Sequence, residues 1–361
     1  IYQNFMHCYR YHKNLQKMHV YIEQLRSYND ITIQSMNECL AITDSLSSYN
    51  GFNIVVKNNK FILEEMNAEL YKVTPYKFGF SKIVNVGQAL KQFYAIHCNA
   101  TYHETLIYSF GFNGFIDNII QLRDLIDNKI VNKCSFTKKD TEFKNAYFAS
   151  LKNSSAVKNT YNLKKNMVIT GPNAAGKTTM LKTTLFNIIL SQQIGFGFYK
   201  SAKVNPYDYI HCYINIPDTS GRDSLFQAEA RRCKDIIDCI DTYNNKRHFC
   251  VFDELYSGTN PYEAIASAYS YLHFMNSNKN VNYVLTTHYI DLCLKIERRD
   301  NKYALNYHME IDNTDNEFKY TYKINRGISE IKGGIKVLKE LNYPASIIDL
   351  TESIINNSLS I

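Results

Sequence analysis

The stretch Gly171-Pro-Asn-Ala-Ala-Gly-Lys-Thr-Thr179 constrains the fold of this chain more than any other part of its sequence. It fits the pattern G-x-x-x-x-G-K-[ST] and lies between an apolar run at 167–170 and a segment from Met180 that has helical spacing. In this pattern small residues let successive backbone N–H groups curl around a phosphate, at the positive end of the following helix. The stretch therefore predicts a strand, a phosphate-binding loop and a helix, and hence a nucleotide-binding protein.

Two side chains of the loop have chemical roles in this interpretation. We expect Lys177 to reach the β- and γ-phosphates and the hydroxyl of Thr178 to bind Mg²⁺. The other positions that we expect to line the nucleotide are Gly171, Pro172, Asn173, Ala174, Ala175, Gly176 and Thr179. A chance match in a turn is the alternative, and the strand and helix patterns on either side argue against it.

A second strand pattern ends in two carboxylates. The apolar run at 248–252 is followed directly by Asp253 and Glu254, which has the form of a Walker B strand. Ligands gather at the carboxyl ends of parallel strands, so we expect Asp253 to hold Mg²⁺ and Glu254 to act as general base toward water. Strands often end in solvated carboxylates, so this pattern alone is a weak signal. It becomes a strong signal of a Mg²⁺–nucleotide site because a phosphate loop precedes it in the sequence.

A third strand pattern, at 281–286, leads to Thr287 and His288. A single histidine after a strand is more often structural than catalytic. As the third polar group in the order loop, carboxylates, histidine, it is expected to contact the γ-phosphate and to position water.

Between the loop and the carboxylates lies a short hydroxyl-rich segment that precedes a helical pattern. Its residues Ser220, Gly221 and Ser224 stand at the expected N-terminus of this helix, a place suited to binding an anion. Such a segment is usually only a helix cap. Its position before the Walker B strand favours a signature that acts in trans, where one subunit completes the nucleotide site of another.

The alternation of strands and helices after residue 150 predicts an α/β domain with a largely parallel sheet. Strands are expected at 167–170, 209–214, 248–252 and 283–286, and helices at 177–192, 223–243, 261–276 and 335–341. Before it, 1–50 reads as a long helix with a break at 27–30, 53–63 as a small hairpin, and 86–97 and 115–126 as helices. We expect three parts: a mostly helical region at 1–150, an ATPase domain at 151–334 and a helical segment at 335–361. The polar segment 132–162 holds the first boundary, with the first strands of the next domain beginning near Tyr147.

Composition excludes several classes of protein. Hydrophobic residues make up 45% of the chain, as in globular proteins, and the longest apolar runs are far shorter than the ~20 residues that span a membrane. We expect no signal peptide and no membrane partner, and an intracellular protein of the cytoplasm or nucleus that is not secreted. The nine cysteines form no C-x-x-C pair, which favours reduced structural thiols. The net charge of +7 is compatible with a nucleic-acid partner without requiring one.

Taken together, these motifs resemble the ATPase domain of the MutS family of DNA mismatch-repair and recombination proteins. The matching elements are Gly171–Thr179, Gln193–Gly195, the run from Ser224 through Phe226 to Glu229, Asp253–Asn260, Thr287–Tyr289 and the closing segment 334–348. The resemblance covers roughly 155–350, and residues 85–130 look like the lever and connector that precede this ATPase. It implies an ABC-type P-loop fold, ATP and Mg²⁺ as ligands, and a homodimer or heterodimer whose two composite sites control a clamp on duplex, mismatched or branched DNA. It also implies that the helical segment 335–361 is a dimerisation segment. Gln193 would be a minor contributor to ATP binding.

The sequence departs from the family pattern at several points. Ala174 and Ala175 replace the usual methionine and small residue of the loop, and both are small enough for it. Ala156 stands where the family has the aromatic side chain that stacks on adenine. Gly221 lies one residue further from Ser224 than usual. Apart from Phe252–Glu254 at the Walker B strand, these 361 residues contain no Phe-x-Glu that could be the mismatch-reading motif, so the motifs predict the ATPase but not what it recognises.

Two other classes of function remain open. The first is another dimeric ABC-type ATPase, although the Leu-Ser-Gly-Gly-Gln of transporter motors and the long heptads of chromosome-maintenance ATPases are absent. The second is a nucleotide-responsive scaffold that no longer turns over ATP, against which the full set of Lys177, Asp253, Glu254 and His288 argues. Single-turnover hydrolysis separates the scaffold from the ATPases, and stimulation by DNA separates the two ATPases.

Overall fold

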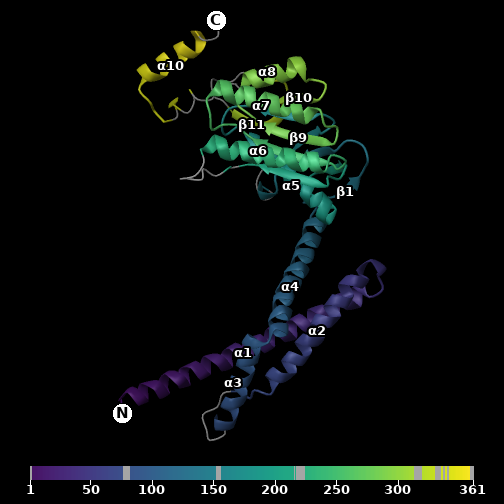
Figure 1. Ribbon diagram of the computed structural model, residues 1–361, viewed down its shortest axis with the longest axis vertical. Coiled ribbons are helices and arrows are strands. Elements are labelled where there is room, and N and C mark those ends of the chain that lie inside the picture. Colours follow the sequence, from purple (N-terminus) through teal and green to yellow (C-terminus); the bar gives the residue numbers. More distant parts are fainter. Residues whose placement is uncertain are drawn as a thin grey trace. The chain divides into compact units, whose positions relative to one another are not determined.

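The strand before the phosphate loop, β4 (Asn166–Thr170), lies inside a six-stranded sheet in the computed structural model of the protein. Figure 1 labels three other strands of this sheet, β9, β10 and β11. The strand order is β11-β10-β4-β9-β8-β7. The other strands are β7 (Tyr209–Tyr213), β8 (His248–Asp253), β9 (Val281–Thr286), β10 (Ala304–Asp312) and β11 (Lys319–Arg326). All neighbours pair in parallel except β10 and β11. The mainly parallel sheet predicted from the sequence is confirmed.

The structure describes residues 2–75, 82–151, 156–214, 216, 224–312, 319–329, 335, 338–339 and 341–357. The chain divides into two compact units, residues 1–124 and 125–361. The division falls inside the helix α4 (Ala100–Asp127), whereas the sequence analysis places the boundary in the polar segment 132–162.

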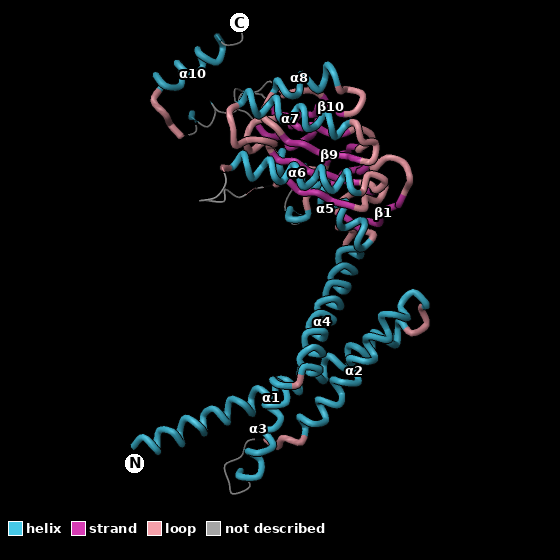
Figure 2. Tube along the Cα trace, viewed as in Figure 1, coloured by secondary structure: helices cyan, strands magenta, loops and turns pink. Residues whose placement is uncertain are grey.

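Helices cover both faces of the large sheet, as Figure 2 shows. On one face α5 (Lys177–Ile194) packs through Leu181 and Ile188 into a core that includes Ile169 of β4. On the other face lie α6 (Leu225–Thr242), α7 (Pro261–Asn276) and α8 (Ile290–Arg299), with a core that includes Val168. Successive residues of β4 therefore enter opposite cores, which explains why this strand reads as a continuous apolar run.

A second sheet, with strand order β3-β2-β6-β1-β5, shares the core on the α5 side. Its strands are β1 (Asn132–Phe136), β2 (Glu142–Ala146), β3 (Asn159–Asn162), β5 (Phe196–Gly197) and β6 (Ser201–Val204), with the 3-10 turn η2 (Ala149–Leu151) between β2 and β3. The sequence predicts that the first strands begin near Tyr147. In the structure they begin earlier, at Asn132 for β1 and Glu142 for β2. Because β1 and β2 pair with β6, some sixty residues later, their short polar segments carry no local signal of a strand.

The first unit is helical. It contains α1 (Tyr2–Thr43), the 3-10 turn η1 (Ser47–Tyr49), α2 (Asn50–Tyr71), α3 (Lys82–Cys98) and most of α4. The buried positions of α1 recur at intervals of three and four residues from Leu25 to Thr43, and α2 returns alongside α1 after the short turn (Figure 1). This spacing places one stripe of α1 against α2, as in a coiled coil.

Two expectations for this unit are wrong. The segment 53–63, expected to be a hairpin, lies inside α2, where burial of Val56 and Leu63 against the helical core overrides the strand preference of the Ile-Val-Val run. The expected break of the first helix at 27–30 is absent, because α1 runs through it. Asn67 of α2 donates to Asp30 at 2.7 Å, so these polar side chains join two helices rather than ending one.

The C-terminal helix is α10 (Ala345–Asn357). Of the helix expected at 335–341, residues 335, 338 and 339 are helical, and residues 336, 337 and 340 lie outside the described residues. Within the described part of the chain, every helix is too short or too polar to span a membrane.

Candidate nucleotide-binding site

The loop between β4 and α5 has the backbone that its small residues allow. Gly176 has a φ of +95°, and a Cβ at this position would lie 3.0 Å from Cδ1 of Tyr322. Ala174 has a φ of +64°, a left-handed conformation that costs a non-glycine residue about 1 kcal/mol. The loop therefore keeps a compact turn that ends at the N-terminus of α5, where free backbone N–H groups and the helix dipole favour an anion.

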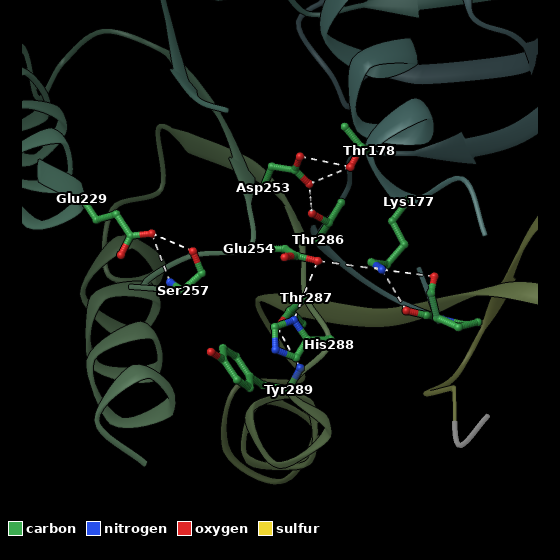
Figure 3. A network of polar contacts seen from close by, with 12 residues as sticks. Lys177, Thr178, Glu229, Asp253, Glu254, Ser257, Thr286, Thr287, His288 and Tyr289 are labelled. Carbon is green, nitrogen blue, oxygen red and sulfur yellow. Dashed lines mark hydrogen bonds and ion pairs between the residues drawn. The ribbon is translucent and has the colours of Figure 1, made fainter. Parts of the chain in front are cut away.

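Lys177 begins α5 and folds back over the loop. Its ammonium donates to the carbonyl oxygens of Gly171 at 2.9 Å and Pro172 at 3.2 Å (Figure 3). The residue is only 6% exposed. Burial lowers the pKa of Lys177, and the carboxylates of Glu254 and Asp253 act in the opposite direction. A buried cation therefore stands at the loop, held by carbonyl groups that a phosphate can replace.

Thr178 and Asp253 meet although they lie on α5 and at the end of β8. The Thr178 hydroxyl lies 3.0 Å from each carboxylate oxygen of Asp253, and the hydroxyl of Thr286, at the end of β9, also donates to this carboxylate (Figure 3). Two hydroxyl groups and a carboxylate form a set of hard oxygen donors, the kind that Mg²⁺ prefers. These donors fit the metal that the phosphate loop implies.

Glu254 follows Asp253 and lies between two basic groups. Its Oε1 is 3.9 Å from Nζ of Lys177 and 3.7 Å from Nδ1 of His288. The polar contact with His288 is the main cause that lowers the pKa of Glu254, the charge of Lys177 adds to it, and burial opposes both. Glu254 itself has a φ of +54°, so the chain turns sharply after the strand and presents the carboxylate to the loop side.

The loop opens into a cavity of about 700 Å³. Its lining residues are Ala146, Phe148, Leu151, Ala156, Val157, Asn159, Asn173, Ala174, Gly176, Lys177, Thr178, Thr179, Met180, Thr183, Glu254, Met309 and Tyr322. The size is that of pockets which take small-molecule ligands. The loop, Lys177, Thr178 and Glu254 thus share one cavity.

Sequence reasoning missed two aromatic residues of this cavity, Phe148 and Tyr322. Tyr322 lies on β11 with a φ of +56°, and its carbonyl accepts a hydrogen bond of 3.0 Å from Asn159, a residue of β3. Ala156 lines the same cavity and offers no ring. The strand that carries Tyr322 pairs with β10 near the end of the chain, so only the fold could reveal that it reaches the loop.

Glu229 is a further residue whose role the sequence did not indicate, although it belongs to the Ser224–Glu229 motif. It is 2% exposed and accepts hydrogen bonds from the backbone N–H of Ser257 and Gly258, both at 3.1 Å, and from the Ser257 hydroxyl at 2.9 Å (Figure 3). It therefore ties α6 to the loop that follows Asp253 and Glu254. The same loop closes on α6 at Gly258, where a Cβ would lie 2.7 Å from the backbone nitrogen of Phe226.

The remaining predicted residues are not all brought to the loop. Gln193 is exposed near the end of α5, roughly 24 Å along the helix from Lys177, since a helix rises about 1.5 Å per residue. Ser220 and Gly221 lie outside the described residues. Ser224 caps α6, where its hydroxyl accepts from the N–H of Gln227 and the Gln227 side chain accepts from the Ser224 N–H. Pro172 and Ala175 are buried in the loop, and Asn173 and Thr179 line the cavity.

Comparison with known proteins gives one consistent result. The family model of MutS domain V matches residues 167–358, from β4 through α10. The DNA mismatch repair protein MutS of Bacteroides fragilis (strain YCH46) is 30% identical over 192 residues, which are 52% of this chain and 22% of that protein. The protein of the same name from Aquifex pyrophilus is 30% identical over 183 residues, 50% of this chain and 21% of that protein. The protein of the same name from Rickettsia akari (strain Hartford) is 29% identical over 197 residues, which are 54% of this chain and 21% of that protein.

The matched region spans about a fifth of the length of these relatives. It contains the phosphate loop, Asp253, Glu254 and His288 in one domain, and the family model covers more than half of the chain. The chain therefore belongs to the MutS family, and its residues 167–358 match the P-loop ATPase domain of that family.

Proposed function

We propose that the protein is a DNA-dependent ATPase that binds ATP with Mg²⁺ at the β4–α5 loop and uses the nucleotide state to control its grip on DNA. One observation carries this proposal: Lys177, Thr178, Asp253, Glu254 and His288, from two strand ends and one helix, meet beside a single cavity. A cation, a hydroxyl group and carboxylates at one place are the groups needed to bind a phosphate chain together with a divalent cation.

In ATP binding, the loop N–H groups and the Lys177 ammonium hold the β- and γ-phosphates. Thr178 and Asp253 hold Mg²⁺, which neutralises charge on the phosphates when bound. Because the Thr178 hydroxyl and the Asp253 carboxylate already lie within hydrogen-bond distance, both would reach one ion with little movement. The phosphates likewise replace the carbonyl oxygens of Gly171 and Pro172 around Lys177.

In hydrolysis, the Glu254 carboxylate orients a water molecule and accepts its proton. Contact with His288 and Lys177 keeps this carboxylate ionised, which makes it ready to accept but weaker as a base. His288 is half exposed and contacts the same carboxylate oxygen of Glu254 that Lys177 contacts, which places its ring close enough to the loop to reach a terminal phosphate. We assign it to positioning water and γ-phosphate.

Ala156 stands where the family has an aromatic residue that stacks on the base. We propose that the rings of Tyr322 and Phe148 stack on the base instead. Tyr322 lies directly against Gly176 of the loop, and both rings line the cavity. Stacking on an aromatic face tolerates any base, so these rings supply affinity more than selectivity for adenine.

We propose that a second MutS-like chain, identical or related, closes the nucleotide site. Ser220, Gly221 and Ser224 of one chain would then approach the γ-phosphate bound by the other, through the N-terminus of α6. The segment 335–361 would supply dimer contacts, since Ile347, Leu350 and Ile354 of α10 are exposed.

DNA is proposed as the partner because the relatives carry the name DNA mismatch repair protein. Mismatch repair, or a related role in DNA repair or recombination, and a location with DNA in the cytoplasm or nucleus follow from that partner. The alternative is an ABC-type ATPase that responds to no mismatch.

The test is the steady-state ATPase rate with no DNA, homoduplex, mismatched duplex and branched DNA. Stimulation by any of the three DNAs supports the proposal, and the preferred DNA identifies the role. An ATPase rate that no DNA changes contradicts DNA dependence, and no hydrolysis above that of the Lys177→Ala variant contradicts the ATPase assignment itself.

A further inference from the structure

At the other end of β8 from the nucleotide site, a cluster of nitrogen and sulfur atoms forms among the described residues. His211 of β7, Cys239 of α6 and His248 of β8 each place one potential ligand atom within 4.8 Å of the other two. Nε2 of His211 and Nδ1 of His248 are 3.0 Å apart. None of these residues takes part in the proposed chemistry of ATP.

His248 is held in the state that a metal ligand needs. Its Nε2 lies 3.0 Å from the carbonyl oxygen of Tyr243, and because a carbonyl only accepts, Nε2 carries the proton. In the neutral ring the lone pair is therefore on Nδ1, which points at His211. A histidine that binds metal nearly always donates its other N–H to such a group, which fixes its tautomer and ring direction.

The C-terminal end of α6 supplies both the Tyr243 carbonyl that orients His248 and the third potential ligand, Cys239. Tyr243 caps α6 one turn after Cys239, and its N–H donates to the Cys239 carbonyl. The rings of Tyr209, His211 and His248 are stacked, with Tyr209 and His248 centroids 5.1 Å apart and His211 and His248 centroids 5.3 Å apart. Both histidines are buried, at 9% and 0% exposure. The imidazoles are thus held by packing, and the half-buried Cys239 thiol lies within 4.8 Å of a ring nitrogen of each.

The distances suit a small tetrahedral ion. Zinc with bonds of about 2.0–2.1 Å to nitrogen and 2.3 Å to sulfur separates two nitrogens by roughly 3.3 Å and a nitrogen from sulfur by roughly 3.6 Å. The histidine nitrogens need to move by a few tenths of an ångström, and the thiol by about 1 Å. Two imidazoles and a thiolate are ligands that zinc prefers and Mg²⁺ does not.

We propose that His211, Cys239 and His248 bind a divalent zinc-like metal ion, with water as the fourth ligand. On binding, the Cys239 thiol releases its proton to solvent, and the proton of His211 moves from Nε2 to Nδ1, so that three lone pairs face the ion. The ion joins the edge strand β7, its neighbour β8 and the C-terminal turn of α6. It lies about five strand residues, or roughly 17 Å, from Asp253, and does not compete with Mg²⁺.

The test uses the full chain, stripped with a chelator, kept reduced and titrated with Co²⁺ in the presence of Mg²⁺. We expect one equivalent to produce visible d–d bands and a thiolate-to-cobalt charge-transfer band. Cys239→Ser should remove the charge-transfer band and weaken Co²⁺ binding at least about tenfold. The matched control is Cys212→Ser, which changes a half-buried thiol on the opposite face of β7 and should leave both unchanged.

A second readout is thermal unfolding. Zinc at roughly a hundredfold excess over its Kd should raise the Tm of the wild-type chain by about 5–10 °C, and should raise that of His211→Gln and Cys239→Ser much less. Absence of cobalt bands together with no zinc-dependent change in Tm means that the histidines form a hydrogen-bonded structural pair only. A charge-transfer band that persists in Cys239→Ser, or vanishes in Cys212→Ser, places the metal elsewhere. Either result overturns the proposal.

Discussion

Glu254 and Lys177 show how a few side chains prepare this site before any nucleotide enters. The carboxylate is shared by two basic groups, and the ammonium is already desolvated and bonded to loop carbonyls. Placing both groups in advance reduces the reorganisation needed when charge develops on the phosphates.

Glu254→Gln tests the general-base assignment. The amide keeps the shape of the side chain but cannot accept a proton, so hydrolysis should slow by about 10²- to 10⁴-fold while ATP remains bound. Single-turnover hydrolysis measures the first effect and nucleotide retention on a filter the second. An unchanged rate removes Glu254 from this role.

Tyr322→Ala tests the proposed stacking surface. Loss of one aromatic face is worth about 1–3 kcal/mol, so ATP should bind about tenfold to a hundredfold more weakly. Tyr322→Phe keeps the ring and is the matched control. Equal affinities for ATP in the alanine variant and the wild type, measured by titration calorimetry, contradict stacking on this residue.

At the residue level, the sequence predicted much of this arrangement. Lys177, Thr178, Asp253 and Glu254 lie close together because parallel strands end at one edge of the sheet. Tyr322 was missed because its hydrogen-bond partner is distant in the sequence. Glu229 was missed because it accepts hydrogen bonds from backbone N–H groups, which leave no pattern in the sequence. Asn159, which donates to the Tyr322 carbonyl, is 163 residues before it.

At the level of elements, α6 and the loop after β8 fit together without spare room. Gly258 touches the first turn of α6, with Leu225 Cγ only 2.8 Å from where its Cβ would be. The backbone nitrogen of Phe226, 2.7 Å from the same Cβ position, is fixed by the helix and cannot move aside. The contact joins the N-terminus of α6 to the segment that carries Asp253 and Glu254.

Gly258→Ala should therefore lower the free energy of unfolding by about 1–3 kcal/mol. Gly111→Ala is the control in the opposite direction, because Gly111 lies exposed inside α4 with nothing within 4 Å of its Cβ position. That change should stabilise the helix by about 0.5–1 kcal/mol. Denaturant unfolding of both variants measures the difference, and a neutral Gly258→Ala would show that α6 can shift.

The elements predicted correctly are those with strong local patterns, such as α5, α7 and the strands β4, β8 and β9. α2 was mistaken for a hairpin because its Ile-Val-Val run favours a strand locally, and only packing against α1 decides otherwise. The small sheet was missed because its strands are four or five residues long or shorter and pair over long separations.

At the level of the whole molecule, a composite site can be tested by mixing two defective chains. Lys177→Ala removes the phosphate contact of its own chain, and Ser220→Arg blocks the surface offered to the partner. Each variant alone should be inactive. Random exchange between equal amounts should restore roughly a quarter of the wild-type ATPase rate, because half of the dimers then contain one intact site of two. No recovery, despite exchange shown by mass, contradicts sites shared between chains.

The strand order also bears on how the protein is made. β4 appears early in the second unit, yet its two neighbours, β9 and β10, are translated more than a hundred residues later. Until then the apolar strand has no partner on either edge, and pairing over such separations is slow. During synthesis the nascent chain should therefore remain sensitive to protease until residue 312 has left the ribosome, and should become resistant soon afterwards. The phosphate loop precedes most of the ATPase domain in the sequence but can take its final form only after nearly all of it has emerged.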